Sequence, residues 1–367
     1  MKKFLFLLSI LIGLKSFSQN LYVTKTFSEN GVYKSFLSEI DTSNGIINNN
    51  YLFSQSTDQS LLVVSPKYEA QSNSIYTFKG NKIYNNNGLN YANQTSFGGL
   101  PNALYPYREI IVINNRLFAT RSINTSGMNY DLILYELNKN DGSIISSKTW
   151  SVVYTTNGYG TTVNEATSDI YNIIGNNVIK YNILDETSTI FNLSGSNLAT
   201  SYKGIILAND RLFVRKADVL IHSLVEIDKT NGTVIASQVL TSNFENYYPS
   251  GNLVFLPESN EIVGSYYGLL TNPNSNKVLK FNIYTNTETI LNLPTEIKTD
   301  DVTEDYWQLI VLNSSQFLAS NFFESENENL KVKAVYNLLG QKVSLDVKNQ
   351  ILVIAYENGK IVKTINR

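Results

Sequence analysis

The 367-residue chain has no cysteine, one histidine and few charged residues. Without cysteine there are no disulfides, thiolate zinc sites or catalytic thiol, and no lipid-modified cysteine to anchor a lipoprotein. One histidine cannot build a metal site from several imidazoles. Charged residues make up 16% of the chain and the formal net charge is −2. The broad basic footprint of a nucleic-acid-binding protein is therefore missing, and we expect no nucleic-acid partner.

The residues that are abundant favour strands. Aromatic residues make up 12% of the chain, including 24 tyrosines, and isoleucine, valine and threonine are frequent. Aromatic and β-branched side chains suit the pleated surface of a sheet. Asparagine, serine and threonine dominate the polar positions and suit short turns. We therefore predict an all-β fold.

The N-terminus has the pattern of a secretory signal peptide. Lysines at positions 2 and 3 precede the apolar run Phe4–Leu14, and small residues follow it. The run is too short to span a bilayer, which takes about 20 residues. We predict a signal peptide over residues 1–18, cleaved between Ser18 and Gln19, which leaves a mature protein without an integral membrane span.

One hairpin pattern recurs along the chain. It is clearest at Leu224–Leu240, where an alternating strand runs into an Asp-Lys-Thr-Asn-Gly turn and a second strand follows. We expect Gly232 to take a left-handed conformation in this turn. Two further clear copies and two weaker ones lie at Leu37–Ile47, Leu134–Ile145, Lys180–Ile190 and Lys280–Ile290.

The repeating unit is longer than the hairpin, because an apolar strand, a polar turn and another strand precede it, as in Lys203–Ala217. Four strands therefore form one unit. We mark the end of each third strand by its last apolar residue, at Ile40, Ile83, Leu137, Ile183, Ile227 and Ile283. A four-stranded unit every 40–50 residues or so is typical of the blades of a β-propeller. Six blades are predicted.

The first unit lacks its own first strand. The segment Trp307–Leu312 has the character of such a strand and would complete the unit, closing the ring and hiding sheet edges that invite aggregation. Seven blades remain an alternative, because Gln316–Phe322 resembles a further second strand.

This strand pattern, together with the Asp-x-x-x-Gly turns at Asp41–Gly45 and Asp228–Gly232, resembles the secreted quinoprotein-like and lactonase-like β-propellers. The resemblance covers roughly Gln19 to Asn321 and implies a propeller domain over residues 19–323. It implies no particular activity, since propellers carry many unrelated sites.

The segment 330–367 follows an acidic linker at residues 324–329. Near its start it has a motif that consists of Tyr336, Asn337, Leu338, Leu339, Gly340, Gln341, Lys342 and Val343, and near its end it has residues 358–363, Asn-Gly-Lys-Ile-Val-Lys. With these two features it resembles the C-terminal sorting domain of type IX secretion, found in Bacteroidetes. The resemblance rests on one motif near its start and on the last strands, and it lacks that family's early strand pair. It implies the type IX machinery as a partner and a secreted or outer cell-surface location. The alternative is that Lys331–Val347 supplies two strands of a last blade.

Residues with catalytic or metal-binding chemistry have simpler structural interpretations. His222 is expected to be a strand histidine bonded to a neighbour, so we predict no catalytic residues. Arg116 and Arg211 recur at the start of the second strand and are expected to be structural. An acidic cluster could hold one calcium ion, although a solvated loop is the more common outcome; it consists of Asp300, Asp301, Glu304 and Asp305.

Aromatic residues recur in the connectors that lead from an outer strand to the next inner strand. In a propeller these connectors surround one mouth of the central channel, where aromatic rings can stack on sugars or extended peptides. The alternative is that they wedge between blades. The candidate ligand-binding residues are Tyr105, Tyr107, Tyr159, Tyr202, Tyr247, Tyr248, Tyr306 and Trp307.

These observations predict a non-enzymatic recognition protein for glycan or peptide, with no cofactor. Two alternatives stay open. One is a propeller enzyme, such as a lyase, lactonase or hydrolase, that uses carboxylates and a metal. The other is a structural or adhesive surface protein with no small ligand.

Overall fold

A computed structural model describes most of the chain, with gaps. Within the described part the regular elements are strands, and no helix there has the length and apolar character needed to cross a membrane. The described residues are 19–29, 32–56, 64–69, 71–79, 82–87, 94–99, 109–127, 129–153, 159–193, 201–217, 222–240, 249–266, 268–269, 277–293, 304–305, 308–313, 332–337, 341–344, 350–356 and 361–366.

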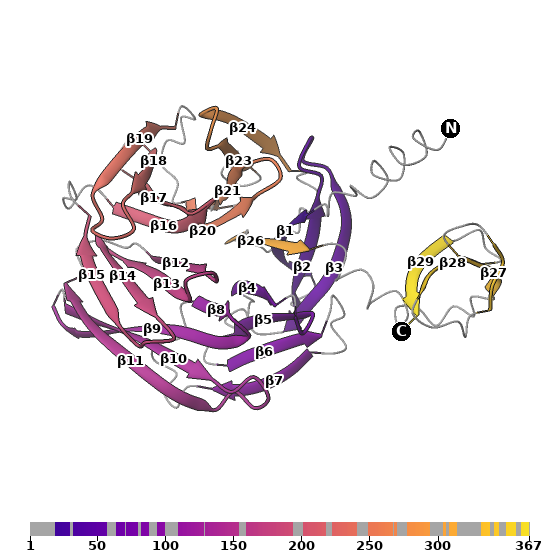
Figure 1. Ribbon diagram of the computed structural model, residues 1–367, viewed down its shortest axis with the longest axis horizontal. Helices are drawn as coiled ribbons and strands as arrows, with labels where there is room; N and C mark the ends of the chain where they lie inside the picture. The colour runs from indigo at the N-terminus through magenta and orange to yellow at the C-terminus, as the bar shows by residue number, and fades with distance from the viewer. Residues whose placement is uncertain are drawn as a thin grey trace, which may run out of the picture.

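Six four-stranded antiparallel sheets surround a common axis (Figure 1). We number them as blades 1–6 in chain order and give their strands from the axis outwards. The first three blades consist of β26 (Gln308–Asn313), β1 (Gln19–Glu29), β2 (Val32–Ile40) and β3 (Ile47–Ser56); β4 (Val64–Glu69), β5 (Ser74–Lys79), β6 (Lys82–Asn87) and β7 (Gln94–Gly99); and β8 (Glu109–Ile113), β9 (Arg116–Ser126), β10 (Asn129–Leu137) and β11 (Ile144–Val153).

The other three blades have the same order. They consist of β12 (Tyr159–Asn164), β13 (Asp169–Ile174), β14 (Asn177–Asn182) and β15 (Ser188–Asn192); β16 (Ser201–Ala208), β17 (Arg211–Ala217), β18 (His222–Ile227) and β19 (Val234–Val239); and β20 (Pro249–Leu256), β21 (Glu261–Tyr266), β23 (Lys277–Asn282) and β24 (Thr287–Asn292).

The predicted six-blade propeller and its mode of closure are confirmed. Strand β26 pairs antiparallel with β1, with Leu21 opposite Val311, so strands from the two ends of the propeller share blade 1. The strand predicted at Trp307–Leu312 therefore occurs one residue later. The segment 316–322, which suggested a seventh blade, lies outside the described residues.

One of the six strand markers was misplaced. Five of them lie at the end of a third strand or directly after it, but Ile83 is the second residue of β6. The error has a clear cause: β6 ends in Asn85-Asn86-Asn87, so blade 2 has no apolar residue at the position marked in the other blades.

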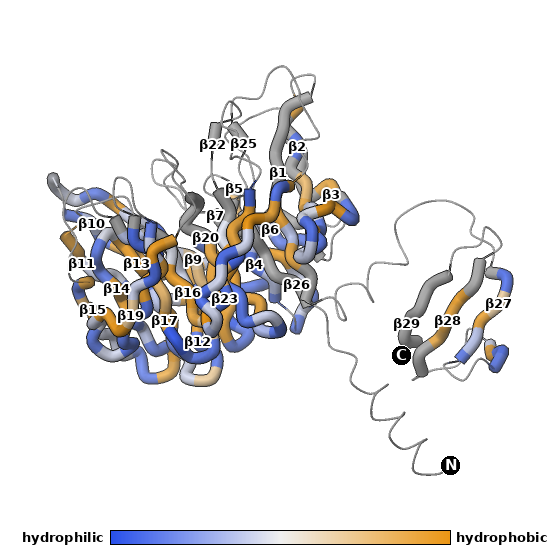
Figure 2. Tube along the Cα trace, turned by 90° about the horizontal axis from the view of Figure 1, so that it is seen from above, coloured by the Kyte–Doolittle hydropathy of each residue, from blue (hydrophilic) through white to orange (hydrophobic). Residues whose placement is uncertain are grey.

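Apolar side chains form the core between neighbouring blades. One cluster joins Tyr171, Val178 and Phe191 of blade 4 to Leu212 and Val225 of blade 5, and similar clusters join blades 2 and 3, 3 and 4, 5 and 6, and 6 and 1. Figure 2 shows apolar residues along the strands and hydrophilic ones at the turns of one rim. Removing this apolar surface from water, at about 25 cal/mol per Å², holds the blades face to face without disulfides.

The turns show that the blades alternate between two types. In blades 3 and 5 the two inner strands are joined by two residues, Asn114-Asn115 and Asn209-Asp210, all with positive φ, as in a type I′ turn. In blades 2, 4 and 6 the same connection has four residues and ends in one left-handed residue. These residues are Asn73, Ser168 and Asn260.

The outer turns alternate in the same way. In blades 1, 3 and 5 the turn closes with a left-handed glycine, and Gly232 has φ +75°, as predicted. In blades 4 and 6 the left-handed residue is Glu186 or Asn286. The clear and weak copies of the hairpin pattern are therefore two kinds of blade, and blades 3 and 4 and blades 5 and 6 form two-blade units. The outer turn of blade 2 lies outside the described residues.

Arginine side chains join the two blades within a unit. Arg116 of blade 3 forms a two-point ion pair with Glu136, at 2.7 and 2.8 Å, and its Nη1 donates to the carbonyl of Ile183 in blade 4 at 2.9 Å. Arg211 of blade 5 repeats this arrangement with Glu226 and with Ile283 of blade 6. Both arginines have the structural role that the sequence predicted.

The Arg116–Glu136 pair makes a pH-dependent contribution to stability. The hydrogen bond from Arg116 is the main cause that lowers the pKa of Glu136 below its ordinary value of 4.5. Because the folded-state pKa is the lower one, this contribution is complete above the unfolded-state pKa. It is lost as the pH falls through the folded-state value.

The tail forms a sheet of its own. Strands β27 (Val332–Asn337), β28 (Gln350–Tyr356) and β29 (Ile361–Asn366) pair in sequence order and lie outside the ring of blades (Figure 1). They are therefore not strands of a last blade, which was the alternative for Lys331–Val347. A further two-stranded sheet pairs β22 (Gly268–Leu269) with β25 (Glu304–Asp305).

Candidate ligand site in the central channel

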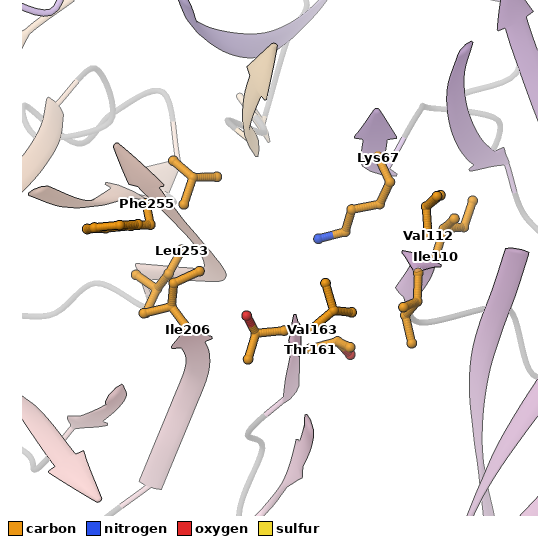
Figure 3. A pocket seen from close by; sticks show the side chains of 11 residues that line it. Lys67, Ile110, Val112, Thr161, Val163, Ile206, Leu253 and Phe255 are labelled. Atoms are coloured by element: carbon orange, nitrogen blue, oxygen red, sulfur yellow. The ribbon is translucent and has the colours of Figure 1, made fainter. Parts of the chain in front are cut away.

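The innermost strands enclose a cavity of about 230 Å³ on the propeller axis. Its described lining comes from five blades, through β4, β8, β12, β16 and β20, and is mainly aliphatic. Figure 3 shows the side chains that line it. Volumes of roughly 300–1,000 Å³ are typical of small-molecule pockets, so this cavity suits a small ligand or one end of a chain. The lining includes Ile110, Val112, Val163, Ile206, Leu253 and Phe255.

Lys67 is the one ionisable side chain among the described residues of this lining. It is half-buried, and its ammonium group points from the wall of blade 2 towards the centre of the cavity (Figure 3). Lys67 lies two residues before the end of β4. The corresponding residues of β8, β12, β16 and β20 are Ile111, Thr162, Ile206 and Val254.

The nearest carboxylate along the chain has other partners. Glu69, at the end of β4, is 4% exposed. Its Oε1 forms an ion pair with Nζ of Lys139 in blade 3, at 2.7 Å. Its other oxygen accepts from Ser72 and Tyr76. Burial, followed by the charge of Glu69, raises the pKa of Tyr76 to about 12. Among the described residues, no carboxylate pairs with Lys67.

Close backbone contact fixes the wall between blades 4 and 5. A Cβ atom on Gly160 of β12 would lie 2.8 Å from Cα of Gly204 in β16, so no side chain fits between these strands. Next to this contact, the hydroxyl of Thr162 accepts a 3.0 Å hydrogen bond from the backbone N–H of Leu207. These contacts give the cavity a preformed wall.

Among the aromatic candidates, Tyr202 is the one whose side chain the structure describes. Tyr202 is 1% exposed and packs in the core cluster between blades 4 and 5, so its ring does not reach a ligand in the channel. Tyr202 therefore packs between blades, which was the alternative interpretation of these aromatic residues. Tyr159 begins β12, but its side chain is not described. The other candidates lie outside the described residues: Tyr105, Tyr107, Tyr247, Tyr248, Tyr306 and Trp307.

The remaining sequence candidates are placed only in part. His222 is a half-buried strand residue at the start of β18. Glu304 and Asp305 form β25, while Asp300 and Asp301 lie outside the described residues. In the part of the chain that the structure describes, no three acidic, histidine or cysteine side chains converge in a way that could hold a metal ion.

The segment Tyr336–Val343, which resembles a sorting motif in sequence, contains two hydrogen bonds between the same pair of residues. The amide of Asn337 donates to Oε1 of Gln341 at 2.9 Å, and its oxygen accepts from the backbone N–H of Gln341 at 3.0 Å. Val343 packs against the small core of the tail sheet. Of the other motif residues, Leu338, Leu339 and Gly340 lie outside the described residues, as does Ser18 at the predicted cleavage site.

Lys67 was not singled out from the sequence. Its signal is a basic residue in an innermost strand where the other blades have aliphatic residues or threonine. That contrast appears only once the blades are aligned by the pairing of their two inner strands.

Comparisons with known proteins support the fold. No family model matches the chain, and no curated protein matches it. A protein of unknown function from Bacteroides caccae is similar in structure, with a TM-score of 0.51, 9% identity, and coverage of 80% of this chain and 98% of that one. A chain of a nidogen/laminin complex is similar with a TM-score of 0.52, 9% identity and the same coverage. At such identities the likeness shows the β-propeller fold alone.

Proposed function

We propose that this propeller is a non-enzymatic recognition protein that binds peptide segments at its central channel. The observation that carries the proposal is the preformed, mainly aliphatic cavity on the axis, lined from five blades. Apolar side chains of a peptide gain free energy when they leave water for such a lining. A neutral glycan would place its hydroxyl groups against aliphatic walls that offer them few partners. The channel itself therefore favours peptide over glycan.

Glycan is the second candidate, and a different observation favours it. Aromatic residues recur in the sequence just before the innermost strands, and the strands have the same order in each blade, so the innermost strands start at one face of the ring. Rings there would stack on sugar faces. A ligand held in this way would contact the connectors and leave the cavity open.

Narrowing the cavity separates these two candidates. The variant Val163→Phe adds an aromatic ring to the channel lining and is expected to weaken binding to a peptide array at least about tenfold, which corresponds to 1.4 kcal/mol. Binding to a glycan array is expected to stay unchanged. Ser147→Phe, on the exposed outermost strand of blade 3, is the control. If wild-type protein retains neither ligand class, or if peptides bind both variants equally, recognition in the channel is refuted.

We also propose that the protein is exported and that its tail directs delivery to the cell surface or the medium through the type IX machinery. Two observations support this: the signal-like N-terminus, and a tail that folds as a separate three-stranded sheet.

Deleting residues 330–367 tests the tail. Because β27–β29 pair only with one another, the truncated protein is expected to melt within about 2 °C of the full chain, a change of roughly 1 kcal/mol or less. It is also expected to remain inside the cell. Mass spectrometry of cell fractions measures the location, and a truncated protein that still reaches the surface would show that the tail is not the signal.

A further inference from the structure

The geometry points to a carboxylate subsite at Lys67, which takes a small apolar group that carries a carboxylate. The subsite deepens the peptide recognition proposed above, because an apolar C-terminal residue of a peptide has this chemistry. A free aliphatic or aromatic carboxylic acid has it too. The assignment rests on three observations: the position of the ammonium group, the nature of the surrounding wall, and the absence of a described counter-ion.

The ammonium group lies where a ligand would meet it. It extends from β4 into the open centre of the cavity, and Leu253 and Phe255 of blade 6 form the wall that it faces (Figure 3). A carboxylate bound to Lys67 would therefore have its apolar body against these two side chains. One end of the ligand would form a charge-assisted hydrogen bond, and the rest would be transferred out of water.

The aliphatic wall strengthens the preference of Lys67 for a ligand with a negative charge. An ion pair between an ammonium and a carboxylate becomes stronger as the surroundings become less polar. Lys67 is half-buried among Ile110, Val112 and Val163, in surroundings far less polar than those of the exposed lysines on the outer strands. A ligand that brings a negative charge also provides a partner for an ammonium group that is partly removed from water.

Neighbouring groups leave Lys67 available. Glu69, the carboxylate of the same strand, is bound by Lys139 of blade 3 and by Ser72 and Tyr76 of its own blade. The corresponding positions of four other innermost strands have no charge; they are Ile111, Thr162, Ile206 and Val254. Thr162 accepts a backbone hydrogen bond and is itself only 8% exposed.

Calorimetric titration of the full-length chain tests the subsite with matched probes. The acids are 4-methylpentanoate and an N-acetylated tripeptide ending in leucine with a free carboxylate; the controls are the corresponding primary amides. We expect the acids to bind with one site per chain and the amides to bind at least about tenfold more weakly, a difference of 1.4 kcal/mol.

Two lysine variants complete the comparison. Lys67→Met removes the charge, keeps most of the side-chain volume, and is expected to remove the preference for acid over amide. Lys67→Arg keeps the charge and is expected to retain the preference. Lys148→Met, on the exposed strand β11, is the control and is expected to bind as the wild type does. Thermal melting confirms that each variant is folded.

The outcomes distinguish the subsite from the broader proposal. Equal binding of acid and amide, or an unchanged preference in folded Lys67→Met, overturns the subsite, while peptide recognition survives if internal peptide segments still bind. Binding of 4-methylpentanoate alone supports the subsite for free acids and counts against peptide recognition. Binding of the tripeptide acid alone identifies peptide C-termini as the ligand.

Discussion

Replacing Gly232 by alanine is expected to lower the free energy of unfolding by about 3 kcal/mol, because two unfavourable effects combine. The residue has φ +75°, where an alanine costs about 1–2 kcal/mol. The added Cβ atom would also lie 2.3 Å from Cδ2 of Phe191, a buried ring on the outer strand of blade 4. Overpacking of this kind adds about 1–3 kcal/mol. Chemical denaturation measures the difference.

Gly127 provides the matched control. It also has a positive φ, of +56°, but a Cβ atom there meets nothing within 4 Å. Gly127→Ala is therefore expected to cost only the backbone strain, about 1 kcal/mol. In a double-mutant cycle, Gly232→Ala and Phe191→Ala together are expected to cost less than the sum of their separate costs, by about 1 kcal/mol or more. Equal costs for the two glycine variants would show that blade 5 does not pack on Phe191 in this way.

Replacing Gly160 by alanine is expected to cost about 3 kcal/mol for a different reason. Its φ is not in the left-handed region, so contact alone decides the outcome. The Cβ atom would lie 2.8 Å from Cα of Gly204 and 3.0 Å from the backbone nitrogen of Ile205. A backbone yields less readily than a side chain, so β12 and β16 must separate. We expect a melting temperature about 6 °C lower, since 1 kcal/mol corresponds to about 2 °C in a domain of this size.

Gly264 is the control for Gly160, because an alanine at Gly264 replaces a glycine in a strand without meeting a backbone atom. An alanine there would meet only Cδ2 of Leu253, at 3.1 Å, which is the end of a flexible side chain. Gly264→Ala is expected to change the melting temperature by about 2 °C or less. If Gly160→Ala melts at the wild-type temperature, the close approach of blades 4 and 5 at the channel wall is not as described.

Different levels of the structure could be predicted from the sequence with different success. The four-stranded unit, the turn at Gly232 and the closing strand near Trp307 could be predicted because each depends on local pattern: alternation, turn chemistry and repetition. Where local pattern was weak, prediction failed. The Asn-rich end of β6 concealed the end of the third strand of blade 2, and Ile83 was chosen in its place.

The candidate site was harder to predict than the fold. Tyr202 was expected in the connectors at the channel mouth, but it lies between blades at 1% exposure. A tyrosine near a strand start has the same sequence pattern whether it faces a ligand or a neighbouring blade. The signal of Lys67 could not be recognised from its own strand, because a single lysine becomes significant only when other strands place aliphatic side chains around it.

The sequence by itself determined that this is an all-β chain of repeated four-stranded units, because strand alternation and turn residues are properties of short segments. The tertiary structure alone decided how these units differ and what they enclose. Arg116 in blade 3 and Arg211 in blade 5 occupy matching positions because each donates to a backbone carbonyl in the following blade. Lys67 faces the cavity because six innermost strands converge on one axis. Both relations join residues far apart in the chain, so they exist only in the folded protein.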